Sequence, residues 1–102
     1  MKLTRFEDLE CLAPLDNFYF VYVLKSEKDN NFYTGYSQNL HKRIEEHNKG
    51  GVESTIHRGP FKLVYYEGCL NREDALKRER YLKTTWGRRY IKSRLNNWLR
   101  SI

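Results

Sequence analysis

Glu79 is the residue whose position in this sequence most clearly indicates chemistry. In a helix with about 3.6 residues per turn, Ala75, Glu79, Leu82 and Trp86 fall on one stripe, so the carboxylate lies along an apolar face. Removing an unpaired carboxylate from water is unfavourable by several kcal/mol, so we expect Glu79 to be paired, to bind a cation, or to lie at the edge of the buried face. Two kinds of cation fit this position: an arginine on the sheet side, which would form a structural ion pair, or a divalent metal ion.

Two further pairs of side chains belong to the same candidate site. Arg43 and His47 are four residues apart and share one face of a predicted helix. Tyr22 and Tyr33 lie in two predicted strands, and Gly35 leaves space beside the Tyr33 ring because it has no side chain. Taken singly, strand tyrosines are usually core residues and helical Arg–His pairs usually face solvent. The hypothesis of a site therefore depends on the fold bringing these side chains together with Glu79.

One carboxylate (Glu79), one guanidinium (Arg43) and side chains that can transfer protons (Tyr22, Tyr33 and His47) suit the hydrolysis of a phosphate ester. One carboxylate is enough for Mg²⁺ (or Mn²⁺) that keeps most of its water molecules and binds substrate phosphate. Arg43 would complement the negative charge on phosphate oxygens. A tyrosine with its ordinary pKa of about 10 is a poor base at neutral pH. Tyr22 or Tyr33 can therefore deprotonate water only if the metal ion or Arg43 lowers its pKa; otherwise the tyrosine orients water and His47 is the better base.

The sequence around these positions contains three predicted strands and three predicted helices. Aromatic and β-branched runs predict strands over residues 18–24, 32–36 and 61–67, and turn residues 28–31 join the first two as a hairpin. Both faces of the first run are apolar, which is typical of a central strand. Helices are expected over residues 39–49, capped by Ser37 or Asn39, over 71–84, capped by Asn71, and over 87–99. The order ββαβαα predicts an α+β fold, a mixed α/β sandwich.

The net charge of +6 is concentrated at one end of the chain. Residues 1–17 carry −2, residues 18–71 carry +1 and residues 72–102 carry +7, with aromatic side chains among the cations of the last part. Such a surface attracts polyanions and predicts nucleic-acid binding, although the same pattern also suits a solvated helix face. The candidate nucleic-acid contacts are Arg58 in a polar loop and Lys83, Trp86, Arg88, Arg89 and Lys92 in the basic part.

The length of 102 residues suits one domain. We expect this domain over residues 18–102, preceded by an acidic extension over residues 1–17 in which the segment TRFE predicts either a short capped helix or a frayed arm. No window approaches the roughly 18 apolar residues of a membrane span, and the first residues lack the apolar run of a signal peptide, so we expect a cytoplasmic protein without a membrane partner. Cys11 and Cys69 are far apart in the sequence, which suits reduced thiols rather than a zinc site.

The candidate site residues lie in an ordered set of short motifs: VYV at residues 21–23, YTG at residues 33–35, Arg43, His47, and Glu79 within ALKRERYLK. This set resembles the GIY-YIG nuclease domain, and the resemblance covers about residues 18–98. The segments FYTGYSQNLHKRIEEHNKG and PFKLVYYEG strengthen it, and the sequence is most similar to small stand-alone members labelled as excinuclease-like or uncharacterised. Phe20 replaces the first motif glycine, and Thr34 replaces the second motif isoleucine, which spares the reactive groups.

The resemblance implies a three-stranded antiparallel sheet flanked by helices. It also implies that Glu79 holds a divalent ion, that Arg43 contacts the scissile phosphate, and that Tyr22 and Tyr33 are the motif tyrosines, one of which helps to generate or place the attacking water. His47 matches a histidine present in part of the family. Some relatives also carry a polar group in the following loop and a late asparagine, for which the candidates here are Thr55, His57, Asn96 and Asn97.

These observations predict a metal-dependent endonuclease that hydrolyses phosphodiester bonds in DNA, and the resemblance implies a role in DNA repair. Two alternatives remain open: a non-catalytic nucleic-acid-binding module on the same scaffold, and a nuclease subunit that depends on a partner. Substrate choice would come from this domain, from a homo-oligomer or from a protein partner.

Overall fold

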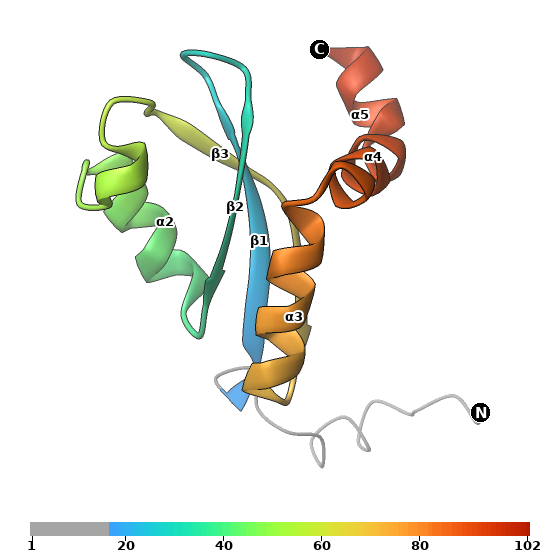
Figure 1. Ribbon diagram of the computed structural model, residues 1–102. Coiled ribbons are helices and arrows are strands. Elements are labelled where there is room, and N and C mark those ends of the chain that lie inside the picture. The colour runs from blue at the N-terminus through green and yellow to red at the C-terminus, as the bar shows by residue number, and fades with distance from the viewer. Residues whose placement is uncertain (1–16) are drawn as a thin grey trace, which may run out of the picture.

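The structure is a computed structural model that describes residues 17–102. The predicted N-terminal helix or arm, and Cys11, lie outside the described residues. Three strands are formed by β1 (Tyr19–Ser26), β2 (Phe32–Ser37) and β3 (Phe61–Cys69). Helices follow the order α2 (Leu40–Asn48), the short 3₁₀ helix η2 (Glu53–Thr55), α3 (Arg72–Leu82), α4 (Thr85–Arg94) and α5 (Asn96–Ser101) (Figure 1).

The three strands form one antiparallel sheet in the order β2-β1-β3. β1 is the central strand, and its residues Val21, Tyr22, Val23 and Leu24 are all buried because both of its faces are covered. This confirms the predicted α+β fold and the antiparallel sheet that the resemblance implied. A register shift between Val23 and Leu24 offsets the pairing of β1 with β3.

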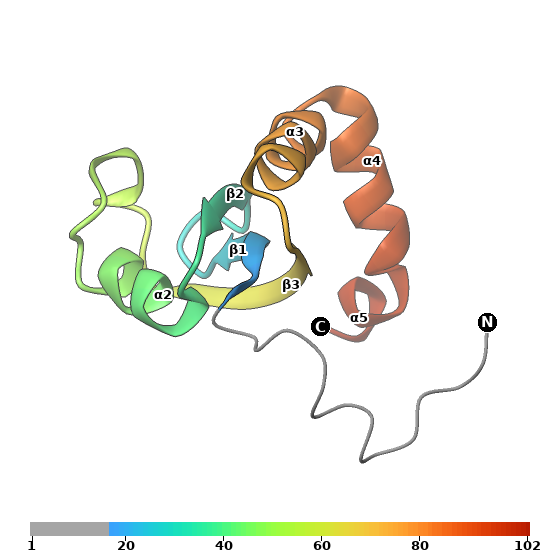
Figure 2. The same cartoon turned by 90° about the horizontal axis from the view of Figure 1, so that it is seen from below.

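Alternate residues of β1 pack into two separate hydrophobic cores, one on each face of the sheet. Val21 and Val23 pack with Ala75, Leu82 and Ile91 of α3 and α4. On the opposite face, Tyr22, Leu24 and Phe61 pack with residues of α2. Figure 2 shows α2 on one side of the sheet, α3 and α4 on the other, and β2 as the edge strand between them. The two helices that carry candidate site residues, α2 and α3, therefore lie in opposite layers of the fold.

The helical segment after β3 differs from the prediction at its end. A single helix over 87–99 is wrong: α4 already begins at Thr85, α5 follows it, and the break falls at Leu95. α4 starts early because the Thr84 side chain accepts a hydrogen bond from the Gly87 backbone at 3.2 Å. The stripe predicted from Ala75 to Trp86 consequently ends at Leu82, and Trp86 is 67% exposed.

Arg78 fixes the position of α4 against the sheet. Its guanidinium donates two hydrogen bonds to Glu67 of β3, at 2.6 and 3.3 Å, and lies 5.3 Å from the Tyr81 ring centre and 4.9 Å from that of Tyr90. Bidentate pairing and stacking of this kind need the planar guanidinium of arginine. The clamp connects β3, α3 and α4, and so sets the orientation of the basic helix.

Gly35 gives a test of the contact between β1 and β2. It pairs with Tyr22, and a methyl group at Gly35 would overlap the hydroxyl end of the Tyr22 ring, so the space left by the glycine belongs to Tyr22 rather than to Tyr33. Gly35→Ala should lower the free energy of unfolding by about 1–3 kcal/mol, because the buried ring has nowhere to move. Urea denaturation measures this change. Gly59→Ala is the control, because its added methyl group would lie 3.9 Å from the nearest atom of Phe61; equal stability of the two variants would contradict the expectation.

Candidate active site

A buried chain of polar groups connects the sheet, α2 and the following loop. The Tyr22 hydroxyl lies 2.8 Å from His47 Nε2, and His47 Nδ1 lies 2.8 Å from the Thr55 hydroxyl. All three residues are at most 1% exposed. The strand, the helix and the loop thus meet at one imidazole, and each nitrogen of that imidazole has a partner.

Aromatic rings surround His47. Its ring centre lies 4.9 Å from that of Tyr33 and 5.8 Å from those of Tyr22 and Phe61. Burial, and secondarily the positive charge of Arg43, lowers the pKa of His47 from 6.5 to about 4. The imidazole is therefore neutral at pH 7 and keeps one nitrogen lone pair.

Burial acts in the opposite direction on Tyr22. It raises the pKa of the phenol to about 12, and the nearby Arg43 guanidinium opposes part of this rise. Tyr33 and the Glu79 carboxylate add to the rise through their charges. The Tyr22 phenol is consequently protonated at neutral pH in the free protein, and does not act there as a ready-made base.

Arg43 sits at the mouth of the site on α2, which begins where the Asn39 side chain accepts a hydrogen bond from the Lys42 backbone. The guanidinium lies 3.1 Å from Glu46 Oε2, and both side chains are partly exposed, at 35% and 40%. Arg43 and Glu46 line an open depression of about 370 Å³ between α2 and the end of β2. Glu46 was missed at the sequence level, although its spacing of three residues from Arg43 is the signal that marks a helical ion pair.

Glu79 approaches from the other layer of the fold. Its side chain is 18% exposed, and its Oε2 lies 3.1 Å from the ammonium group of Lys83, one helical turn further along α3. The partner observed is thus a lysine of the same helix and not an arginine from the sheet. Because the Lys83 side chain is 51% exposed, solvent weakens this pair, and the ammonium can move away when another cation arrives.

The donor set around Glu79 restricts the kind of metal ion that fits. Within residues 17–102 no group of three or more His, Cys, Asp or Glu side chains is placed to enclose an ion. A single partly open carboxylate suits a hard ion such as Mg²⁺, which keeps several water ligands and takes its remaining ligands from substrate phosphate. Glu79 is therefore the residue that would hold such an ion here.

The candidate nucleic-acid contacts fall into different surroundings. Trp86 is exposed, and the Arg89 guanidinium lies 5.1 Å from its ring centre. Arg88 and Lys92 line a hollow of about 300 Å³ between α4 and the start of β2. Arg58 instead donates to Asp29 at 2.8 Å, which ties its loop to the β1–β2 hairpin.

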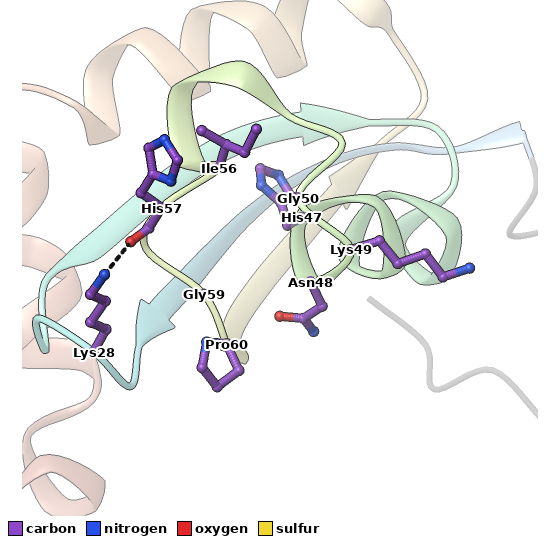
Figure 3. A pocket seen from close by; sticks show the side chains of 9 residues that line it. All are labelled: Lys28, His47, Asn48, Lys49, Gly50, Ile56, His57, Gly59 and Pro60. Atoms are coloured by element: carbon purple, nitrogen blue, oxygen red, sulfur yellow. Dashed lines mark hydrogen bonds between the residues drawn. The ribbon is translucent and has the colours of Figure 1, made fainter.

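The structure distinguishes the two polar candidates in the loop after α2. Thr55 is buried against His47, whereas His57 is exposed and lines an open hollow of about 520 Å³ between the end of α2, the β1–β2 hairpin and the loop before β3. His47 also lines this hollow. Figure 3 shows Lys28 reaching across that hollow to the backbone oxygen of His57, at 3.0 Å, with Lys49 projecting on the other side. Ser54, which sequence reasoning missed, donates to the Tyr33 hydroxyl at 3.5 Å. Asn96 and Asn97 are exposed on α5, away from these contacts, and their role stays a prediction.

The lowered pKa of His47 predicts a pH-dependent stability. Between pH 6.5 and pH 4, His47 is protonated in the unfolded chain but neutral in the folded protein. The free energy of unfolding therefore falls by about 3 kcal/mol as the pH drops through this window. Urea denaturation at pH 7 and at pH 4 should show a smaller loss for His47→Gln than for the wild type. His57→Gln, which removes an exposed imidazole, should retain the wild-type loss. Identical pH dependence of all three proteins would contradict the assignment.

Comparison with known proteins matches residues 18–96 to the GIY-YIG catalytic domain. The chain is 51% identical over 65 residues to the UPF0213 protein CPE1444 of Clostridium perfringens, which covers 63% of this chain and 69% of that protein. It is 44% identical over 71 residues to a UPF0213 protein of Pediococcus pentosaceus, covering 69% and 74%. It is also 41% identical over 68 residues to the UPF0213 protein YazA of Bacillus subtilis, covering 66% and 68%.

A solved structure also resembles the chain. The solution NMR structure of the UPF0213 protein BH0048 from Bacillus halodurans shares 32% sequence identity, covers 74% of this chain and 83% of its own, and gives a TM-score of 0.48. In residues 17–102, no helix combines the length and the apolar character needed to cross a membrane. Because the family match extends from the residue before β1 to the start of α5, the chain belongs to the GIY-YIG family, among whose small members are the UPF0213 proteins.

Proposed function

We propose that this protein is a metal-dependent endonuclease that hydrolyses phosphodiester bonds in DNA in the cytoplasm. The observation that carries the proposal is the distance of 2.8 Å between the buried Tyr22 hydroxyl and His47 Nε2, with Arg43 acting to lower and the Glu79 carboxylate to raise the pKa of that phenol. The family match supports the reaction class. The basic surface supports a polyanionic substrate.

Each side chain then has a distinct task. Glu79 would hold a divalent ion, Mg²⁺ or Mn²⁺, which when bound polarises the phosphate. Arg43, partly open to solvent, would bind the scissile phosphate oxygens. Tyr33 is the less buried of the two tyrosines and would place the attacking water. Tyr22 would take up a proton only after the substrate and the ion have changed the charges around it, because its pKa of about 12 keeps it protonated in the free protein.

A second function has a specific observation in its favour. Lys83 already neutralises Glu79, and Tyr22 is fully buried, which would suit a nucleic-acid-binding module without catalysis. The two functions differ in what a metal ion does: it is required for cleavage in one and irrelevant to binding in the other. In either case a protein partner or a second copy of the chain would supply further substrate specificity.

Glu79→Gln tests the enzyme against the binding module. In the presence of Mg²⁺ or Mn²⁺, we expect the variant to lose cleavage by about 100-fold or more, because the amide cannot hold the ion, while its affinity for DNA stays within about twofold. A panel of flap, branched, nicked and single-stranded DNA measures both quantities. Glu73→Gln, an exposed carboxylate of the same helix, is the matched control. Undiminished cleavage by Glu79→Gln would remove the proposed role, and a wild type that binds but cuts nothing in the panel would favour the binding module.

Arg88 and Lys92 test the nucleic-acid surface. They lie four residues apart on α4 and line the same hollow, so each should neutralise one phosphate of the bound strand. Each substitution to glutamine should weaken binding and reduce the slope of log K against log salt by about 0.9. Lys25→Gln is the control, because the Lys25 ammonium is held by Asn30 at 2.8 Å on the hairpin. Salt slopes equal to that of the control would place the bound strand elsewhere.

A further inference from the structure

Thr55 is a buried polar residue to which the proposed reaction assigns no role. It closes η2, is 1% exposed, and has its hydroxyl 2.8 Å from His47 Nδ1. A hydroxyl and an imidazole can each donate or accept, so the distance alone does not say which way the hydrogen bond runs. The direction follows from the groups at the two ends of the chain.

At one end stands the Tyr22 hydroxyl. Within residues 17–102, His47 Nε2 is the acceptor that lies within hydrogen-bonding distance of this fully buried group. A buried O–H group without an acceptor is unfavourable, so Tyr22 donates to His47 and Nε2 carries the lone pair. Arg43, whose guanidinium acts to lower the pKa of the same phenol, has only donor groups and so does not compete with His47 as an acceptor of the Tyr22 proton.

At the other end stands the backbone carbonyl of Val52, which can only accept. It receives the Thr55 hydroxyl at 3.4 Å and the Thr55 backbone N–H at 3.0 Å. The Thr55 hydroxyl therefore donates its hydrogen bond to the Val52 carbonyl and accepts one from His47 Nδ1–H. Val52 is itself only 7% exposed, which keeps water away from this end of the chain.

We propose that Thr55 is a positioning residue that holds neutral His47 in the Nδ1–H tautomer, so that His47 Nε2 faces the Tyr22 proton as a base. The chain then runs in one direction, from the Tyr22 O–H to His47 Nε2, from His47 Nδ1–H to the Thr55 oxygen, and from the Thr55 O–H to the Val52 carbonyl. The opposite tautomer would point an N–H at Tyr22 and leave the buried Tyr22 proton without an acceptor.

The consequence for catalysis rests on the proposed function. In the free protein this transfer is strongly unfavourable, because the pKa of Tyr22 is about 12 and that of His47 is about 4. Only when bound substrate and ion lower the pKa of the phenol does the O–H bond break and an N–H bond form at His47 Nε2, which leaves a phenolate and an imidazolium. The Thr55 oxygen and the phenolate then accept the two N–H groups of the imidazolium, and the phenolate is free to take a proton from the attacking water. Without Thr55, the imidazolium would carry a buried N–H without a partner.

The tautomer is measured directly by two-bond ¹H–¹⁵N NMR spectra of the histidine rings at pH 7. We expect the wild type to show a protonated Nδ1 and an unprotonated Nε2 for His47, with exposed His57 as the reference signal. Thr55→Ser keeps the hydroxyl and should keep this pattern. Thr55→Val has nearly the same shape without the hydroxyl and should give a mixture of the two tautomers. A wild type with protonated Nε2 overturns the proposal, as does a Thr55→Val variant with an unchanged pattern; the wild-type and Thr55→Ser spectra decide it even if Thr55→Val does not fold.

Cleavage measurements supply the second readout. Thr55→Val should lower kcat by about tenfold with KM within about twofold, because Thr55 touches no substrate, and Thr55→Ser should restore kcat. Thr85→Val, at an exposed threonine of α4, is the matched control and should leave kcat unchanged. A Thr55→Val variant with wild-type kcat overturns the catalytic role. The NMR result does not depend on cleavage, so failure of the proposed function and failure of the tautomer assignment are distinguishable.

Discussion

The candidate site depends on one buried hydrogen bond, that between Tyr22 of the central strand and His47 of α2. Each partner is polar and almost completely removed from water, so neither is stable in its place without the other. The bond fixes the helix against the sheet, and Arg43, one turn earlier on α2, acts to lower the pKa of the same phenol. Gly35 completes the arrangement, because the edge strand carries no side chain where the Tyr22 ring lies.

Burial also sets the proton affinities of these groups. It raises the pKa of Tyr22 and lowers that of His47, so both are neutral in the free protein and the site holds no internal ion pair between them. The charged groups, Arg43 and Glu79, remain partly exposed at the periphery, each with a counter-ion that solvent weakens. In the proposed reaction, a phosphate would replace Glu46 as the partner of Arg43, and a divalent cation would replace Lys83 as the partner of Glu79.

Each of the two helical layers is held against the sheet by its own polar contact. The Tyr22–His47 bond organises the α2 layer, while the bidentate Arg78–Glu67 pair, stacked between Tyr81 and Tyr90, organises the α3–α4 layer. The second clamp presents Glu79 and the basic α4 on the same rigid unit. α2 and α3 lie on opposite sides of the sheet (Figure 2), so the proposed reaction needs groups of both layers to reach one substrate.

The sequence alone determined the three strands, the central place of β1, the cap at Asn71 and the family, because apolar runs, capping side chains and motif spacing are local signals. It left the cap of α2 between Ser37 and Asn39, and the structure has Asn39. It grouped Tyr22, Tyr33, Arg43 and His47 as one candidate site, and the rings of Tyr22, Tyr33 and His47 do lie close together, while the roles of these residues stay predictions. It left open the partner of Glu79 and the choice between Thr55 and His57, and it placed the end of α3 at residue 84 rather than at Leu82. The choice of Thr55 arises from a contact between two elements, because the loop turns Thr55 inward to His47, and the end of α3 arises from competition at a helix end, where Thr84 starts a new helix. The partner of Glu79 is local, since Lys83 lies four residues further along the chain, but the sequence alone does not choose between this lysine and an arginine of the sheet. Only the tertiary structure decides such matters, because burial and the supply of hydrogen-bond partners are properties of the packed molecule and not of any segment of it.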